Sequence, residues 1–292
     1  MSALAGVQFQ SNWLEILGSP FMQHALIGGS LVAVAAGLLG YFVITRQNAF
    51  AAHALAHIGF PGATGAILVG APVTLGLAVF CVGGGLLIGL FGRKVADREM
   101  ATGTILALAT ALGVLFASLA SANASTTTSV LFGNLLAISD DQLLVYGAFT
   151  AAVVGTLAVL ARPLVFASVD PAVAEARGVP VRALGLAFVV LLALTITMAV
   201  QVVGTLLLFA LVVTPAATAL RITARPGRVA LISVALALAA VWGGLVLSAM
   251  VDLPPSFFIV SLAVLAWVVV LAVVGRRRNR PAEPLLDTHH PH

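Results

Sequence analysis

Long apolar stretches, separated by short polar or basic segments, recur along almost the whole chain. Each is close to the roughly 20 residues that an α-helix needs to cross the hydrocarbon core of a bilayer. Runs such as AFVVLLALTITMAVQVVGTLLLFALVV lack the alternation of apolar and polar positions that strands of a membrane barrel show. Backbone in lipid must satisfy its own hydrogen bonds, and a helix does so. The pattern predicts an all-α, polytopic bundle of transmembrane helices.

The apolar stretches divide the chain into about nine crossings. We expect a single transmembrane domain over residues 1–292, with about 20–275 embedded in the membrane and 276–292 forming a disordered cytoplasmic tail. The crossings are predicted at residues 22–44, 49–70, 72–91, 101–120, 142–161, 183–201, 203–220, 229–250 and 256–274.

Composition supports a membrane protein. Hydrophobic residues make up 61% of the 292 residues and charged residues only 8%, whereas an ordinary soluble domain carries about 25% charged residues. A soluble fold of this length cannot bury so much apolar surface, so that class is excluded. The single cysteine, Cys81, also excludes a disulfide within the chain.

The basic residues indicate an orientation. All 14 Lys and Arg residues fall in alternate connections between the predicted crossings, near residues 46, 93–98, 162–182, 221–228 and 276–280. Connections rich in Lys and Arg stay in the cytoplasm, so we expect the N-terminus outside and the C-terminus in the cytoplasm. The net charge of +4 then reflects orientation in the membrane, and we expect no nucleic-acid partner.

Two histidines interrupt the second apolar stretch, AFAAHALAHIGFPGATGAILVG. On a helix, His53 and His57 would stand on one face with their Cβ atoms about 6 Å apart, close enough for both rings to bind one metal ion. An ionisable residue inside a membrane is by default a candidate functional residue. The alternative is a pair of histidines that each hydrogen-bond a carbonyl of a neighbouring helix.

A predicted helix break follows the histidines directly. Gly59, Pro61 and Gly62 disfavour a continuous helix, because proline lacks an N–H and clashes with the preceding turn. Discontinuous helices are where transporters place their substrate sites. We therefore predict that the second crossing is a broken helix beside an ion pathway.

Four stretches, taken together and in order, resemble the permeases of the zinc/manganese class of ABC importers. They are HALAHIGFPG at 53–62, SVLFGNLLAISDDQLL at 129–144, DPAVAEARGVPVRAL at 170–184 and VVGTLLLFALVVTPAATA at 202–219. The resemblance extends from about residue 20 to 275. It implies a permease subunit in a bacterial inner membrane, arranged as a homodimer with the pathway between two copies. It also implies an ATP-binding subunit and an extracytoplasmic metal-binding protein as partners.

The resemblance also implies the metal contacts. The family uses an aspartate and a histidine four residues apart, and His57 matches the histidine while His53 stands at the aspartate position. Two imidazoles suit zinc better than manganese, so zinc is favoured, with manganese or iron as the other candidates. The ion, Zn²⁺ or Mn²⁺, would be the transported substrate, and no permanently bound cofactor is expected.

A short helix is predicted on the cytoplasmic side. Asp170 can cap it, Pro171 suits its first turn, and Gly178 with Pro180 ends it. The resemblance implies that this is the coupling helix that docks into the ATPase, with Asp170, Glu175, Arg177 and Gly178 as its residues; an ordinary connecting turn is the alternative. The sequence contains no Gly-x4-Gly-Lys-[Ser/Thr] loop, so ATP hydrolysis is expected in a partner and this subunit is not expected to be an enzyme.

Polar residues on the opposite side are weaker candidates. Asn134, Asp140 and Asp141 lie in a connection without basic residues. They are expected either to line an outer mouth that attracts cations or meets a binding protein, or simply to form a turn.

Two other functions fit parts of the pattern. A self-sufficient secondary metal transporter or channel could use the histidines as a proton relay, although such relays usually contain acidic residues inside the membrane and the predicted crossings contain none. An intramembrane metalloprotease would need a glutamate beside its paired histidines. The residues between the histidines are Ala54, Leu55 and Ala56, which disfavours the protease.

Overall fold

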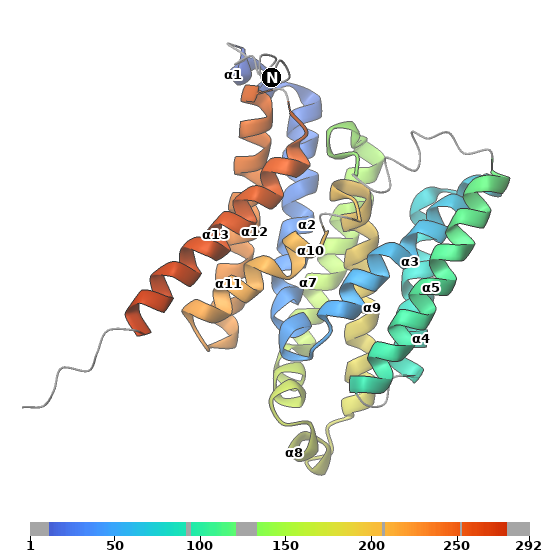
Figure 1. Ribbon diagram of the computed structural model, residues 1–292, viewed down its shortest axis with the longest axis vertical. Helices are drawn as coiled ribbons and strands as arrows, with labels where there is room; N and C mark the ends of the chain where they lie inside the picture. Colours follow the sequence, from blue (N-terminus) through green and yellow to red (C-terminus); the bar gives the residue numbers. More distant parts are fainter. Residues whose placement is uncertain (1–11, 92–94, 121–132, 206–207, 252, 279–292) are drawn as a thin grey trace, which may run out of the picture.

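The computed structural model describes residues 12–91, 95–120, 133–205, 208–251 and 253–278. Within these ranges the regular elements are all helices, and seven of them are long and apolar enough to cross a membrane. The predicted polytopic helical bundle is therefore confirmed (Figure 1). The seven helices are α2 (Pro20–Thr45), α4 (Val73–Phe91), α5 (Val95–Leu119), α7 (Asp140–Val169), α9 (Val181–Val203), α12 (Pro226–Val251) and α13 (Pro255–Arg278). Residues 279–292, most of the predicted disordered tail, lie outside the described ranges.

The other two predicted crossings are shorter or less apolar. The second corresponds to α3 (Ala49–Leu68), a 20-residue helix that packs against α4, α5 and α9. The seventh is divided into α10 (Leu208–Val212) and α11 (Thr214–Ile222). The remaining described elements are α1 (Trp13–Gly18), the 3₁₀ turn η2 (Leu135–Ala137) and α8 (Pro171–Ala176).

The predicted break in the second crossing is wrong. The α3 helix continues through Gly59, Pro61 and Gly62 to Leu68. A proline inside a helix removes one hydrogen bond, which a membrane helix tolerates when its neighbours support it. The glycine serves packing instead: a Cβ on Gly62 would lie 2.3 Å from the carbonyl oxygen of Gly76 on α4. Small residues thus let two backbones approach closely, as is common between membrane helices.

The regular helical structure of α9 ends at Gly204. Gly204 ends that helix with a φ of +82°, a conformation that glycine adopts without steric cost. The residues just before η2 pack directly against this point, because a Cβ on Gly133 would lie 2.5 Å from the backbone nitrogen of Gly204. Pro215 then stands in the first turn of α11, where its missing N–H is tolerated. The interrupted helix is therefore the seventh crossing.

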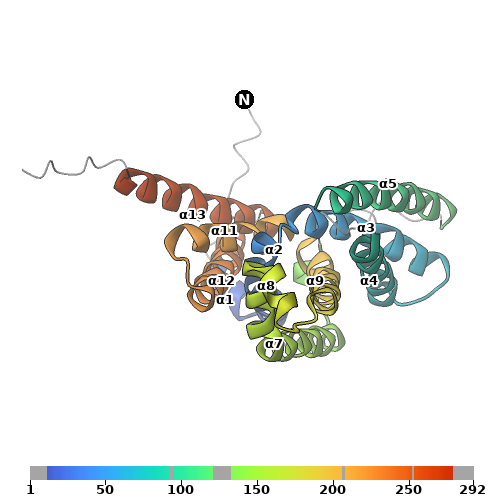
Figure 2. The same cartoon turned by 90° about the horizontal axis from the view of Figure 1, so that it is seen from below.

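Two helices form the centre of the bundle. In the most apolar windows of α2 and α9, 67% of the residues are buried, compared with 17% in α5 and 11% in α13. Glycines allow the close packing of α2: a Cβ on Gly40 would lie 2.4 Å from the carbonyl oxygen of Val212 on α10. Figures 1 and 2 show α13 and α5 towards opposite sides of the molecule, with α2 and α9 between them.

The connections that carry basic residues lie towards one end. In Figure 1 the chain turns in the lower half between α2 and α3, between α7 and α9 and between α11 and α12. These are the described connections near residues 46, 162–182 and 221–228. We refer to this as the basic end of the bundle; the other end holds the N-terminal turn of α7 and η2.

Candidate metal site

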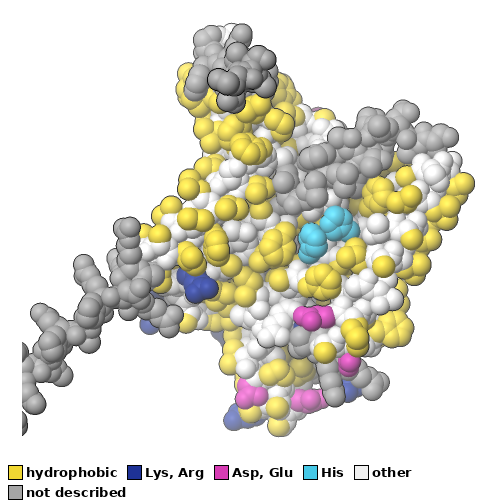
Figure 3. Space-filling model, viewed as in Figure 1, with side chains coloured by type: hydrophobic (Ala, Val, Ile, Leu, Met, Phe, Trp, Pro, Cys, Tyr) yellow, Lys and Arg dark blue, Asp and Glu magenta, His cyan; other side chains and the backbone are white. Residues whose placement is uncertain are grey.

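The two predicted metal ligands lie side by side on α3. The ring centroids of His53 and His57 are 4.9 Å apart, and the ring planes meet at 72°. Both side chains are half-buried, whereas Ala54, Leu55 and Ala56 between them are completely buried. Histidine side chains gather at mid-height on the face in Figure 3, next to hydrophobic and uncharged surface. Two adjacent imidazoles can bind the same divalent ion.

Pro61 changes the backbone next to this pair. It stands four residues after His57 inside α3 and has no N–H, so the His57 carbonyl lacks its usual α-helical donor. Proline positions of this kind are where helices bend or admit water. The proline that suggested a break therefore removes one backbone hydrogen bond from a helix that remains continuous.

The interrupted crossing borders the histidines. The ring of Phe209 on α10 lies 6.0 Å from that of His53, almost perpendicular to it at 87°, and its side chain remains 40% exposed. The apolar sequence around Phe209 gave no reason to single it out. A sequence signal that could have directed attention here is the nearby Thr214-Pro215, since proline disfavours a continuous helix.

The histidines supply an incomplete ligand set. Among the described residues, no group of three or more His, Cys, Asp or Glu side chains could hold a metal ion. A closed zinc site has four protein ligands, so one chain offers two of them on an accessible face. Such a site can bind an ion without enclosing it.

Comparison with known proteins identifies the family. The model of the ABC 3 transport family matches residues 18–274. The chain belongs to this family. The predicted resemblance to the permeases of metal-ion ABC importers is therefore confirmed at the level of the family.

Several relatives are named as manganese transport proteins. The manganese transport system membrane protein MntC of Halalkalibacterium halodurans is 32% identical over 230 residues, which cover 78% of this chain and 77% of the relative. The manganese import system permease protein ScaB of Streptococcus parasanguinis is 32% identical over 200 residues, covering 68% and 71%. A solved structure of PsaBC from Streptococcus pneumoniae in complex with Fab has a TM-score of 0.82 at 27% identity, covering 92% of this chain and 98% of that one.

The short helix of this ABC 3 family member forms as its sequence predicted. The Asp170 side chain accepts a 3.0 Å hydrogen bond from the Val173 amide at the start of α8. Gly178 ends the turn with a φ of +81°. Glu175 and Arg177 are exposed, and α8 lies at the lowest part of Figure 1. The residues predicted to contact an ATPase are thus presented together at the basic end.

The residues predicted at the outer mouth, Asn134, Asp140 and Asp141, make local contacts away from the histidine pair. Asp140 begins α7, and its Oδ1 atom lies 3.2 Å from Nε2 of His24. Asp141 is exposed in the same turn, which Ser139 and Gln142 close as a capping box. The backbone N–H of Asn134 donates a 3.0 Å hydrogen bond to the backbone carbonyl of Gln201. These residues therefore cluster at the end opposite the basic end.

A polar cluster that the sequence did not reveal lies near that end. The Tyr146 hydroxyl donates a 2.7 Å hydrogen bond to the side-chain oxygen of Gln201, whose amide donates a 2.9 Å hydrogen bond to the Thr74 hydroxyl. The three residues belong to α7, α9 and α4. Their contact fixes three helices next to the interruption at Gly204. Each polar side chain alone was unremarkable in the sequence, because its partners are distant along the chain.

Proposed function

We propose that the chain is the membrane-spanning permease subunit of an ABC importer for a divalent transition-metal ion. His53 and His57 are its transient ligands. The observation that carries the proposal is the half-buried pair of rings, 4.9 Å apart on α3, in a chain of the ABC 3 transport family. A transport site must admit its ion and also release it, and two ligands per chain suit that requirement.

Manganese is the first candidate substrate. Both relatives described above are named as manganese transport proteins. Zinc is the second candidate, since His53 stands where the resemblance places an aspartate and imidazole pairs suit zinc and other borderline metals. The donor set thus favours a different metal from the one named for the relatives, and uptake measurements with both ions distinguish them.

Two copies would complete the site. A two-fold axis beside the histidine face brings two His53/His57 pairs together, which gives up to four nitrogen ligands. The exposed Phe209 and the poorly buried α5 and α13 leave apolar surface for such a homodimer or for lipid.

The energy would come from a separate ATP-binding subunit in contact with α8. The exposed Glu175 and Arg177 provide opposite charges for this docking, while Asp170 and Gly178 hold the helix ends. In this arrangement the basic end is cytoplasmic. The Asn134, Asp140 and Asp141 cluster then faces outwards, where an extracytoplasmic metal-binding protein would deliver the ion.

Uptake of radioactive manganese and zinc tests this function in cells that lack their own importers and express the chain with its ATPase and binding protein. We expect His53→Ala/His57→Ala to reduce uptake at limiting metal to the background of empty cells. Thr104→Ala is a matched control, because it removes one exposed hydroxyl from α5 that bonds only within its helix. Uptake that survives the loss of both histidines refutes their role as ligands. Uptake that continues with an inactive ATPase favours the secondary transporter.

A further inference from the structure

A groove runs between α7 and α12 along the central helix α2. Both helices pack against α2, and the space between them contains two cavities, one in each half of the bundle. Figure 2 shows α7 on the side of the molecule opposite to α3 and α5. The groove is therefore separate from the face that carries the histidine pair.

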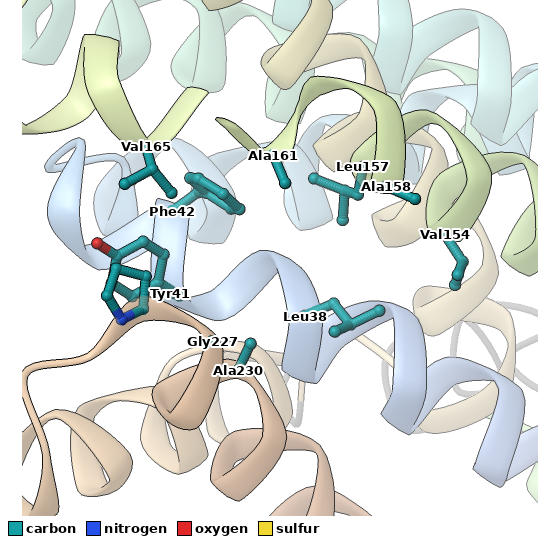
Figure 4. Close-up of a pocket in the computed structure, with 11 residues that line it drawn as sticks. Leu38, Tyr41, Phe42, Val154, Leu157, Ala158, Ala161, Val165, Gly227 and Ala230 are labelled. Atoms are coloured by element: carbon teal, nitrogen blue, oxygen red, sulfur yellow. The ribbon is translucent and has the colours of Figure 1, made fainter. Parts of the chain in front are cut away.

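The cavity nearer the basic end is apolar. It has a volume of about 270 Å³ and is lined by side chains from α2, α7 and the start of α12 (Figure 4). Small residues create the space: Ala158 and Ala161 on α7 face Gly227 and Ala230 on α12. Tyr41 is the residue with a polar side chain in its lining, and its hydroxyl makes no hydrogen bond with any residue of the described ranges.

Positive charge borders this cavity. Arg162 lines a shallow hollow that shares Ala161 and Val165 with it, and Arg225 directly precedes Pro226 in its lining. Both arginines are exposed. Neither forms an ion pair within the described part of the chain, where the recorded pair joins His24 and Asp140. Two exposed arginines without an ion pair in the described residues thus directly adjoin, along the chain, residues that line an apolar cavity.

The cavity in the other half of the groove provides an internal comparison. It has a volume of about 590 Å³ and is also mainly apolar, with Leu26, Ile27 and Val246 among its lining residues. Its polar groups are already paired, since the Trp242 indole N–H donates a 2.8 Å hydrogen bond to the Ser30 hydroxyl. Neither lining contains an arginine or lysine, but Arg162 and Arg225 directly adjoin lining residues of the first cavity along the chain, and no basic residue adjoins those of the second. Nearby charge therefore distinguishes the two halves of the groove.

We propose that the cavity nearer the basic end binds one anionic phospholipid from the adjacent leaflet. An acyl chain fills the space above Ala158 and Ala161, the phosphate lies between Arg162 and Arg225, and the Tyr41 hydroxyl donates to an oxygen of the headgroup or ester. Basic pockets between membrane helices bind anionic headgroups in this way. A transmembrane helix from another protein would fill the apolar space but would leave the two arginines without anionic partners.

Native mass spectrometry of the purified, delipidated full chain tests the site with phosphatidylglycerol and phosphatidylcholine of identical acyl chains. We expect the wild type to retain one phosphatidylglycerol roughly tenfold or more tightly than phosphatidylcholine, since each nearby arginine favours an anionic lipid. Arg162→Gln/Arg225→Gln should remove this preference. Ala161→Leu should weaken the binding of both lipids, because the larger side chain fills the cavity. If Ala161→Leu does not fold, Ala158→Leu is used in its place.

Arg182→Gln is the control, because Arg182 is an exposed arginine at the basic end whose neighbours along the chain do not line the cavity. It should retain the wild-type preference. Equal binding of the two lipids to the wild type overturns the proposal. So does an equal loss in the control and in Arg162→Gln/Arg225→Gln, which would indicate a diffuse charge effect without a site.

Discussion

Gly62 on α3 and Gly76 on α4 approach each other so closely that neither can carry a side chain in place. A Cβ on Gly76 would lie 2.1 Å from the Gly62 carbonyl oxygen, and one on Gly62 would lie 2.3 Å from the Gly76 carbonyl oxygen. Because both obstacles are backbone, a side-chain rotation cannot relieve them. This contact fixes α4 against the helix that carries the histidine pair.

Gly76→Ala should destabilise the fold. Forcing extra atoms into a packed contact costs about 1–3 kcal/mol, and the clash here involves backbone. We expect a lower thermal unfolding temperature in detergent and weaker metal uptake, because α3 must shift. Gly83→Ala on the same helix is the control, since a Cβ there meets nothing within 4 Å. Equal melting temperatures for the two variants would contradict the packing argument.

His53→Asp should change the selectivity of uptake. The variant introduces an aspartate four residues before His57, and a carboxylate with an imidazole suits manganese better than two imidazoles do. We expect the ratio of manganese to zinc uptake to rise above that of the wild type. An unchanged ratio, with normal protein in the membrane, would show that the side chain at position 53 does not select the metal.

His57→Ala alone should reduce uptake of the preferred ion at limiting concentration by at least about tenfold, because even residues that only orient a ligand affect metal affinity roughly 10–100-fold. The unfolding temperature should change little, as the ring is half-buried and lies on an accessible face. Measuring both quantities separates loss of a ligand from loss of the fold. Uptake within twofold of the wild type, by the same assay, would argue against the assignment.

Tyr146→Phe should cost about 1 kcal/mol of stability, the typical net contribution of a hydrogen bond. The change removes the hydroxyl that donates to Gln201 and keeps the ring that is buried beside it. Thr110→Val on α5 is a comparison, because its hydroxyl bonds only to the carbonyl of Leu106 in its own helix. A larger loss for the α5 variant would mean that the Thr74–Gln201–Tyr146 cluster contributes little.

Reversing the charges on α8 should uncouple ATP hydrolysis from uptake. Glu175→Arg/Arg177→Glu changes exposed side chains, so the bundle should remain folded while uptake falls in the complex with the ATPase. Asp170→Ala acts differently: it removes the N-cap hydrogen bond to Val173 and should cost about 1 kcal/mol locally. Full uptake by the charge-reversed variant would place the docking surface elsewhere.

Local signals in the sequence were sufficient for much of the fold. Hydropathy placed the seven long apolar helices, because an apolar stretch of about 20 residues is what a helix needs to span lipid, and α3 begins at Ala49 as predicted. The cap at Asp170 and the end at Gly178 were also predictable, because both depend on a few neighbouring residues. The adjacency of His53 and His57 follows from helical spacing in the same way.

Contacts between distant segments explain the rest. Whether Pro61 breaks a helix depends on what packs around it, and the Gly62–Gly76 contact is invisible in either segment alone. The contact of His53 with Phe209 depends on where α10 lies after helix α9 has ended at Gly204. The seventh crossing contained a comparable proline signal at Thr214-Pro215, but sequence alone could not rank one interruption above the other.

The unequal burial of the helices implies an unequal tolerance of substitution. Positions on α13 and α5 mostly contact whatever surrounds the bundle, so exchanges among aliphatic side chains there leave the interior unchanged. Positions on α2 and α9 meet other helices on most sides, and α2 depends on Gly37 and Gly40 for its approach to α12 and α10. The outer helices are therefore free to adapt to bilayers of different thickness and composition over evolution, while α2 is held to small residues at these two contacts.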